Sequence, residues 1–251
     1  PVDLNTITAT FQGLTQDLIE YHSAKHPGQP EPARDPSLLT QAMQRVLLLL
    51  RKMEQPQAQA VAEADPQPEQ GDSGDIQQLG EYGINLLADL SALAAGLGLA
   101  QESRELEALC LPLSTWIARR GGLLDTLEPV VNALAYQANA IREPLQLEQL
   151  YEMAAEIQQA VTPALQQDLE KSNPRRPWRI LLLNRAIIAT RSHRPELIEL
   201  AYENLLRYLP EEAPQFFREG MQQMDALNYP QPVRDVVERY YRQWSVERTL
   251  H

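Results

Sequence analysis

Seven basic side chains gather between residues 171 and 194, and their type and spacing suggest chemistry more clearly than any others in the sequence. The stretch 170–195 carries these seven against one acid, whereas residues 1–169 carry 23 acidic and 9 basic side chains. Within it, Asn173-Pro-Arg-Arg-Pro-Trp-Arg179 sets three guanidinium groups and an indole on a proline-stiffened turn that leads into a helix. Guanidinium groups match the geometry of carboxylates and phosphates, and a helix start adds backbone amide donors.

We name residues 171–194 the cationic segment, and it supports two interpretations. In the first, it binds an anion or an acidic peptide through five side chains, Arg175, Arg176, Trp178, Arg179 and Arg185. In the second, its arginines pair with carboxylates of the same chain and orient the C-terminal helices, as structural ion-pair networks commonly do. Both are predictions from the local excess of positive charge.

The other reactive side chains form no catalytic or metal-binding pattern. His22 and His26 are four positions apart, so on one helix face they offer two metal ligands, but a site needs a third and a fourth. Cys110 stands in an apolar stripe between Leu109 and Leu113, which is typical of a buried small hydrophobic side chain. The sequence therefore favours a protein that is not an enzyme, and it predicts no metal and no cofactor.

Helices must position these side chains, because nearly every segment repeats its apolar residues at intervals of three and four. The first segment carries this pattern in Leu4, Ile7, Phe11, Leu14, Leu18 and Tyr21. Gly96-Leu-Gly98 and Gly121-Gly122 are predicted helix ends. No segment has the sustained alternation of a β-strand. We predict an all-α fold of about nine or ten helices, arranged as antiparallel helical hairpins that stack as a bundle or a short α-solenoid.

The distribution of large apolar residues predicts three regions. Residues 1–54 form a predicted N-terminal helical hairpin, and residues 76–251 form a predicted main domain that resembles a helical repeat. Residues 55–75 are acidic, rich in proline, glutamine and glycine, and hold few large apolar groups. Because such a stretch cannot offset its ordering entropy by burial, we predict a linker and a domain boundary there.

The last helices are spaced as hairpins of about 35 residues, which is the period of helix-pair solenoids. Trp178-x-x-Leu181, Ala201 and the ending Tyr208-Leu209-Pro210 resemble a degenerate tetratricopeptide repeat, within residues 178–245. This resemblance implies a concave helical surface that binds a peptide or a protein. It implies nothing about catalysis.

Composition excludes some classes of protein. The 251 residues carry a net charge of −12, and a general nucleic-acid binder needs positive charge to displace counterions. The richest apolar stretch, residues 84–100, is interrupted by polar side chains and does not predict a membrane span. The first residues lack the basic and apolar regions of a secretory signal, so we expect a cytoplasmic protein. The apolar stripe of residues 4–21 is also compatible with a homo-oligomer.

We predict a non-enzymatic helical scaffold or adaptor that binds another protein, with the cationic segment as the contact. This hypothesis rests on the all-helical pattern, the missing catalytic pattern and the local positive charge. The alternative is a helical domain that holds a small anionic metabolite between its helices, as a ligand-binding protein or an enzyme. In that alternative, Arg179, Arg185 and a nearby tyrosine or histidine bind the anion.

Overall fold

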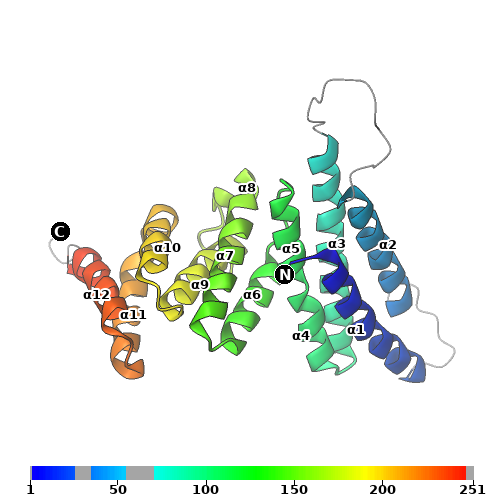
Figure 1. Cartoon of the computed structure of the whole chain (residues 1–251), viewed down its shortest axis with the longest axis horizontal. Coiled ribbons are helices and arrows are strands. Elements are labelled where there is room, and N and C mark those ends of the chain that lie inside the picture. The colour runs from blue at the N-terminus through cyan, green and yellow to red at the C-terminus, as the bar shows by residue number, and fades with distance from the viewer. Residues whose placement is uncertain (1, 26–34, 55–70, 247–251) are drawn as a thin grey trace. The chain divides into compact units, whose positions relative to one another are not determined.

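A computed structural model describes residues 2–25, 35–54 and 71–246, and these residues are predominantly helical (Figure 1). The predicted all-α fold is confirmed, and β structure in the described residues is limited to one isolated bridge between Leu124 and Val161. None of the described helices is long and apolar enough to cross a bilayer. The helices are α1 (Leu4–Lys25), α2 (Pro36–Glu54), α3 (Gly71–Gly96), α4 (Ala100–Ala108), α5 (Cys110–Arg119), α6 (Glu128–Ala140), α7 (Pro144–Ala160), α8 (Pro163–Gln166), α9 (Pro177–Arg191), α10 (Pro195–Tyr208), α11 (Ala213–Leu227) and α12 (Gln231–Val246).

Proline positions decide where several of these helices begin. Pro177 and Pro195 stand at the first positions of α9 and α10, where a missing amide hydrogen costs least. Pro112 cannot donate to the carbonyl oxygen of Ala108, so one helix ends at Ala108 and the next begins at Cys110. This break and the single turn of α8 explain why the described residues form more separate helices than the nine or ten expected.

Two glycines end helices where the sequence predicts an end. Beyond α3, Gly98 has a φ of 84°, and the amide of Leu99 donates to the carbonyl oxygen of Ala94 at 2.9 Å. Beyond α5, Gly121 has a φ of 76°. Glycine adopts this left-handed backbone at little cost because it lacks a Cβ atom, and the reversed chain satisfies carbonyl groups at the helix end.

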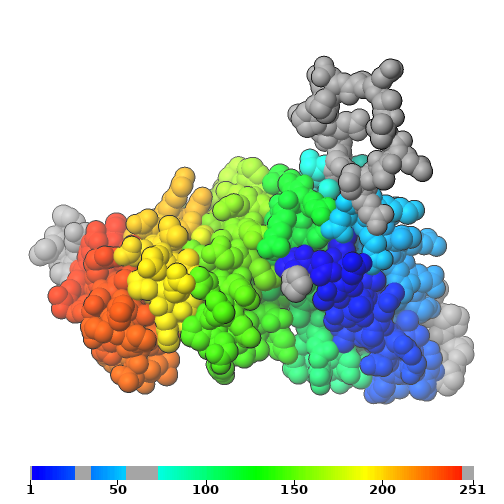
Figure 2. Space-filling view, in the orientation of Figure 1, coloured from blue at the N-terminus to red at the C-terminus, as the bar shows by residue number. Residues whose placement is uncertain are grey.

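The chain folds into two compact units, and the first comprises residues 1–136 and 159–167. Within it α2 packs between α1 and α3, and α3 also packs on α4 and α5. Figure 2 shows the dark blue surface of α1 against the teal surface of α4. The predicted hairpin of residues 1–54 therefore belongs to a larger unit, and the units do not divide at 55–75. Residues 71–75 of the predicted linker form the start of α3, and 55–70 lie outside the described residues.

Glycine permits the closest helix contacts in this first unit. A Cβ atom at Gly80 would lie 2.4 Å from Cδ1 of Ile117, and one at Gly83 would lie 3.2 Å from Cγ1 of Val46. Because packed heavy atoms do not approach to 2.4 Å, a larger residue at position 80 would displace the buried side chain of Ile117 or force α3 away from α5. The missing side chain is what allows α3 to cross α5 at this point.

The second unit comprises residues 137–158 and 168–251. In it α9 and α10 form one helical hairpin, α11 and α12 form another, and α12 also packs on α10 (Figure 1). Tyr202, Phe217 and Tyr240 form an aromatic cluster with ring centroids 5.0, 5.2 and 5.5 Å apart. All three rings are buried, so this cluster is the apolar centre that holds the two hairpins together.

Candidate functional site

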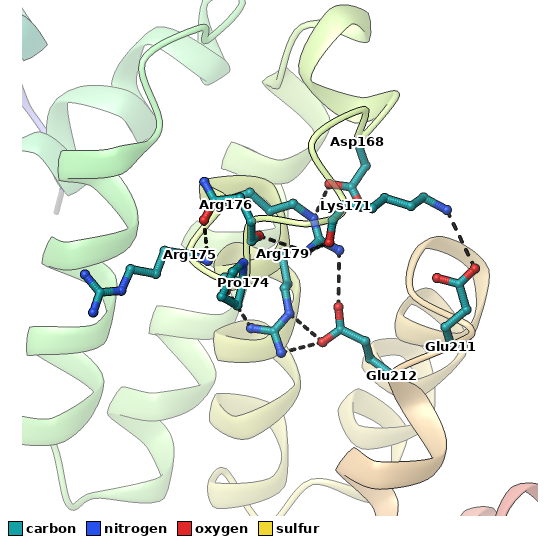
Figure 3. A network of polar contacts seen from close by, with 9 residues as sticks. Asp168, Lys171, Pro174, Arg175, Arg176, Arg179, Glu211 and Glu212 are labelled. Carbon is teal, nitrogen blue, oxygen red and sulfur yellow. Dashed lines mark hydrogen bonds and ion pairs between the residues drawn. The ribbon is translucent and has the colours of Figure 1, made fainter.

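The cationic segment begins as a turn that leads into α9, and Arg176 is the buried centre of that turn (Figure 3). Arg176 is 6% exposed. Its Nε donates to Oδ1 of Asp168 at 2.5 Å, and one terminal nitrogen donates to Oε1 of Glu212 at 3.2 Å. The other terminal nitrogen donates to the carbonyl oxygens of Lys171 and Asn173. Each of the three guanidinium nitrogens therefore donates a hydrogen bond within the chain.

Glu212 joins this turn to the start of α11. Its carboxylate also accepts hydrogen bonds from Arg179 in the first turn of α9, and Arg179 donates as well to the carbonyl oxygen of Pro174 at 2.9 Å. Burial acts to lower the pKa of Arg176, but the carboxylates of Asp168 and Glu212 outweigh it and raise that pKa above its ordinary value. Two arginines thus hold one carboxylate just before α11, and they connect the beginnings of the two hairpins.

Two other cations of the turn are exposed. The side chain of Arg175 extends away from α11 (Figure 3) and has no partner in the described part of the chain; its backbone amide donates to Oδ1 of Asn173. Nζ of Lys171 lies 3.8 Å from the carboxylate of Glu211, and both side chains are more than half exposed. Such an exposed ion pair contributes little to stability.

Trp178 and Arg185 lie inside the second unit. Trp178 is 3% exposed, and its ring packs edge-on against Tyr208 with 5.4 Å between centroids. Arg185 donates to Oε1 of Gln158 and to the hydroxyl of Tyr151, both at 2.7 Å, and its guanidinium carbon lies 4.7 Å from the centre of the Tyr151 ring. These contacts fasten α9 to α10 and to α7, so both side chains serve packing.

The far end of the cationic segment is also neutralised. Arg191 donates to the carbonyl oxygens of Ala138 and Ile141, at 2.5 and 2.8 Å, where α6 ends and its carbonyl groups carry partial negative charge. Arg194 pairs with Glu148 at 2.9 Å. Every basic residue of the cationic segment except Arg175 therefore has a partner among the described residues. Such pairing within the chain is what the second interpretation describes. Binding of an anion or an acidic peptide stays a prediction.

Beside the turn, α9 and α11 line an open groove of about 560 Å³, and the sequence singled out few of its lining residues. Tyr202 of α10 lies against it, and its hydroxyl is 2.9 Å from Oγ1 of Thr190, another lining residue. The apolar side chains of the groove are Leu183, Ile187, Phe216, Met224 and Leu227. Of these, Ile187 is 43% and Leu227 is 62% exposed, so the groove offers uncovered apolar surface.

Most of the charged side chains around the groove have partners within the chain. Its two cations are Arg179, which is held by Glu212, and Arg191, which is held by backbone carbonyl groups. Two further carboxylates stand at its rim, Glu211 and Glu219, and both are exposed. Glu219 accepts a hydrogen bond from the uncharged amide of Gln215 at 2.9 Å. Glu211 lies 3.8 Å from the ammonium group of Lys171, so in the described part of the chain Glu219 is the rim carboxylate without a cationic partner.

The other candidates for chemistry lie apart from this groove. The described residues hold no group of three histidine, cysteine, aspartate or glutamate side chains that could bind a metal ion. His22 lies on α1, and His26 lies outside the described residues. Cys110 is fully buried, and this burial raises the pKa of its thiol well above the ordinary value. The Cys110 side chain is consequently closed to substrates in the folded protein.

No protein-family model, no curated protein and no solved structure matches the chain. What the protein does must accordingly be inferred from the geometry of the second unit, with its paired cationic segment and the groove between α9 and α11.

Proposed function

We propose that the protein is a cytoplasmic, non-enzymatic adaptor that binds a segment of a partner protein in the groove between α9 and α11. The observation that carries this proposal is the exposed apolar surface of Ile187 and Leu227 beside a buried aromatic cluster. Covering such side chains removes apolar surface from water, which is the main favourable term in most protein association. The resemblance of residues 178–245 to a tetratricopeptide repeat supports the same function.

The cationic segment supports this function through its geometry. Arg176 and Arg179 hold Glu212 at the start of α11, so the ion network fixes one end of each groove wall relative to the other. A small anionic metabolite, the alternative ligand, needs free donors at the site. All three nitrogens of Arg179 and both terminal nitrogens of Arg191 already interact within the chain, which favours the adaptor over a metabolite-binding protein.

A selection from a random peptide phage library tests the proposal. Enriched peptides would be synthesised with a fluorescent label, and their affinity for the protein would be measured by fluorescence polarisation. The Ile187→Glu variant places a charge on the groove floor, so it should weaken binding by about tenfold or more. Leu200→Glu is the matched control, because Leu200 is 56% exposed and lies outside the groove.

The control should change affinity by less than about twofold, as expected for a surface substitution outside the contact. Thermal melting of both variants would establish that each is folded. A library that yields no enriched peptide, or peptides that bind Ile187→Glu as well as the unmodified protein, would overturn the groove as the binding site. A thermal-shift screen with phosphates, nucleotides and carboxylic acids examines the alternative, and stabilisation by one of them would favour the metabolite instead.

A further inference from the structure

We infer that Gly220 determines the specificity of this groove, because its missing side chain leaves a notch in the α11 wall that accepts one large apolar side chain of the bound segment. This inference rests on the proposed function and names the chemical class of the residue that the groove recognises. It follows from the place of Gly220 on α11, from the contacts that a side chain there would make, and from the residues that surround it.

Gly220 lies on the face of α11 that lines the groove. Residues four positions apart share one face of a helix, so Phe216, Gly220 and Met224 form a single row, and all three line the groove. Gly220 is thus a gap between two large side chains. Ile187 lines the same groove from α9 and is 43% exposed, so uncovered apolar surface is available beside this gap.

The fold does not require glycine at this position. Gly220 stands in the middle of the fifteen-residue helix α11, where glycine destabilises a helix relative to alanine. A Cβ atom there would lie 3.4 Å from Cγ1 of Val237 and 3.9 Å from the hydroxyl of Tyr202, which are ordinary contact distances. Gly80 differs, because a Cβ atom there would collide with Ile117. Close approach of a ligand is another use of glycine, and it accounts for Gly220.

The surroundings of the notch select an apolar side chain. Phe216 and Met224 flank it in the row, and the ring of Tyr202 lies 5.6 Å from the ring of Phe216. Glu219 belongs to the neighbouring row of α11, where it accepts a hydrogen bond from Gln215. An ionised group placed between Phe216 and Met224 would lose water without gaining a counter-charge in this row, whereas an apolar side chain gains from burial.

Replacing Gly220 by alanine tests the inference, because stability and affinity should change in opposite directions. In Gly220→Ala, the better helix former should raise the melting temperature by about 1–4 °C. The added methyl group also occupies part of the notch, so the affinity for a peptide enriched from the phage library should fall about tenfold.

Gly13→Ala is the matched control, because Gly13 lies in α1 of the first unit and nothing lies within 4 Å of the added atom. It should raise the melting temperature similarly and change the affinity by less than about twofold.

The peptide supplies the second half of the test. Peptides enriched on the unmodified protein should share one position that holds leucine, phenylalanine or tryptophan, and replacing this residue by alanine should weaken binding about tenfold or more. On Gly220→Ala the same replacement should weaken binding by no more than about threefold, because the large side chain no longer enters the notch.

The possible results separate this inference from the proposed function. A lower melting temperature of Gly220→Ala would show that glycine serves packing at this position, and the inference would be wrong. Unchanged affinity of Gly220→Ala, or additive effects of the protein and peptide substitutions, would also overturn it. In each of these cases the proposed function stands if Ile187→Glu still weakens binding. A library without any enriched peptide would overturn the proposed function itself.

Discussion

Arg176 is a buried cation, and its neighbours must replace the water that it loses. Asp168 and Glu212 supply negative charge, and two carbonyl groups of the turn accept further hydrogen bonds. Oδ2 of Asp168 is itself buried, and it has no hydrogen-bond partner among the described residues. Burying such a pair brings little net stability, but removing one member leaves a lone buried charge, which is costly.

Replacing Arg176 should therefore destabilise the protein strongly. We expect Arg176→Met to lower the free energy of unfolding by about 3–5 kcal/mol, because Asp168 is then buried without its cation. The measurement is urea unfolding followed by circular dichroism.

The neighbouring variant Arg175→Met is the control for this change. Arg175 is exposed and its side chain has no partner in the described part of the chain, so its loss should alter stability by no more than about 0.5 kcal/mol. The double variant Arg176→Met/Asp168→Asn should recover part of the loss, because it also removes the stranded carboxylate. Equal stability of the two single variants would contradict a structural role for the Arg176 network.

The sequence identifies the arginines of the site but not their partners. The charge count points to residues 171–194, and pairing within the chain is one of the two predicted outcomes. Glu212, the carboxylate shared by Arg176 and Arg179, lies more than thirty positions further along the chain, among many other acids. Only the fold of the second unit brings it into place, and the same arrangement forms the groove that α9 and α11 line.

Among the elements, helix starts and ends are the features that local sequence determines best. Proline at the beginning of α9 and α10, and glycine after α3 and α5, act within one turn of their own position. The roles of Gly80 and Gly83 depend instead on which helix crosses α3. Since several helices could do so, their periodicity alone gives no sign of these close contacts.

Two glycine-to-alanine substitutions distinguish these kinds of position. At Gly80 a Cβ atom would collide with the buried side chain of Ile117, so Gly80→Ala should lower the free energy of unfolding by about 1–3 kcal/mol. At Gly13, in α1, nothing lies within 4 Å of the added atom. Gly13→Ala should raise the free energy of unfolding by about 0.5–1 kcal/mol, because alanine loses less backbone freedom in a helix. Chemical denaturation of both variants provides the values, and a stabilised Gly80→Ala protein would refute the close crossing.

For the whole molecule, the all-α class follows from periodicity, but the division into units does not. The change of composition at residues 55–75 begins after α2 and extends into the start of α3, and these two helices pack together in the first unit. Residues 159–167 return to that unit, where the amide of Leu124 donates to the carbonyl oxygen of Ala160 at 2.8 Å. Contacts between distant positions define the units, and composition reports only on local segments.

Alkaline pH should destabilise the second unit. Burial raises the pKa of four of its tyrosines above the ordinary value: Tyr151, Tyr202, Tyr229 and Tyr240. Because the folded state holds these protons more tightly than the unfolded state, their contribution is complete below about pH 10 and is lost as the pH rises further. Helix content and tyrosinate absorbance would be followed together in an alkaline titration, and the part of the absorbance that comes from these four phenols should appear as the helix content falls.

A variant with one buried phenol fewer provides the comparison for this titration. In Tyr202→Phe the loss of stability between about pH 8 and about pH 11 should be smaller than in the unmodified protein, even though its stability at neutral pH is lower without the Thr190 contact. An alkaline transition that is identical in both proteins would show that buried tyrosine does not control it.

The burial of Cys110 makes the first unit accessible to a kinetic measurement. Cys110 is the single cysteine of the chain, it is 0% exposed, and its sulfur lies 3.9 Å from the carbonyl oxygen of Ile84 in α3. A thiol-specific reagent can reach it only when α5 separates from α3, so at excess reagent the labelling rate measures how often this part of the molecule opens. The four tyrosines with a raised pKa belong to the other unit, so their titration and the labelling of Cys110 report on different halves of one unmodified chain.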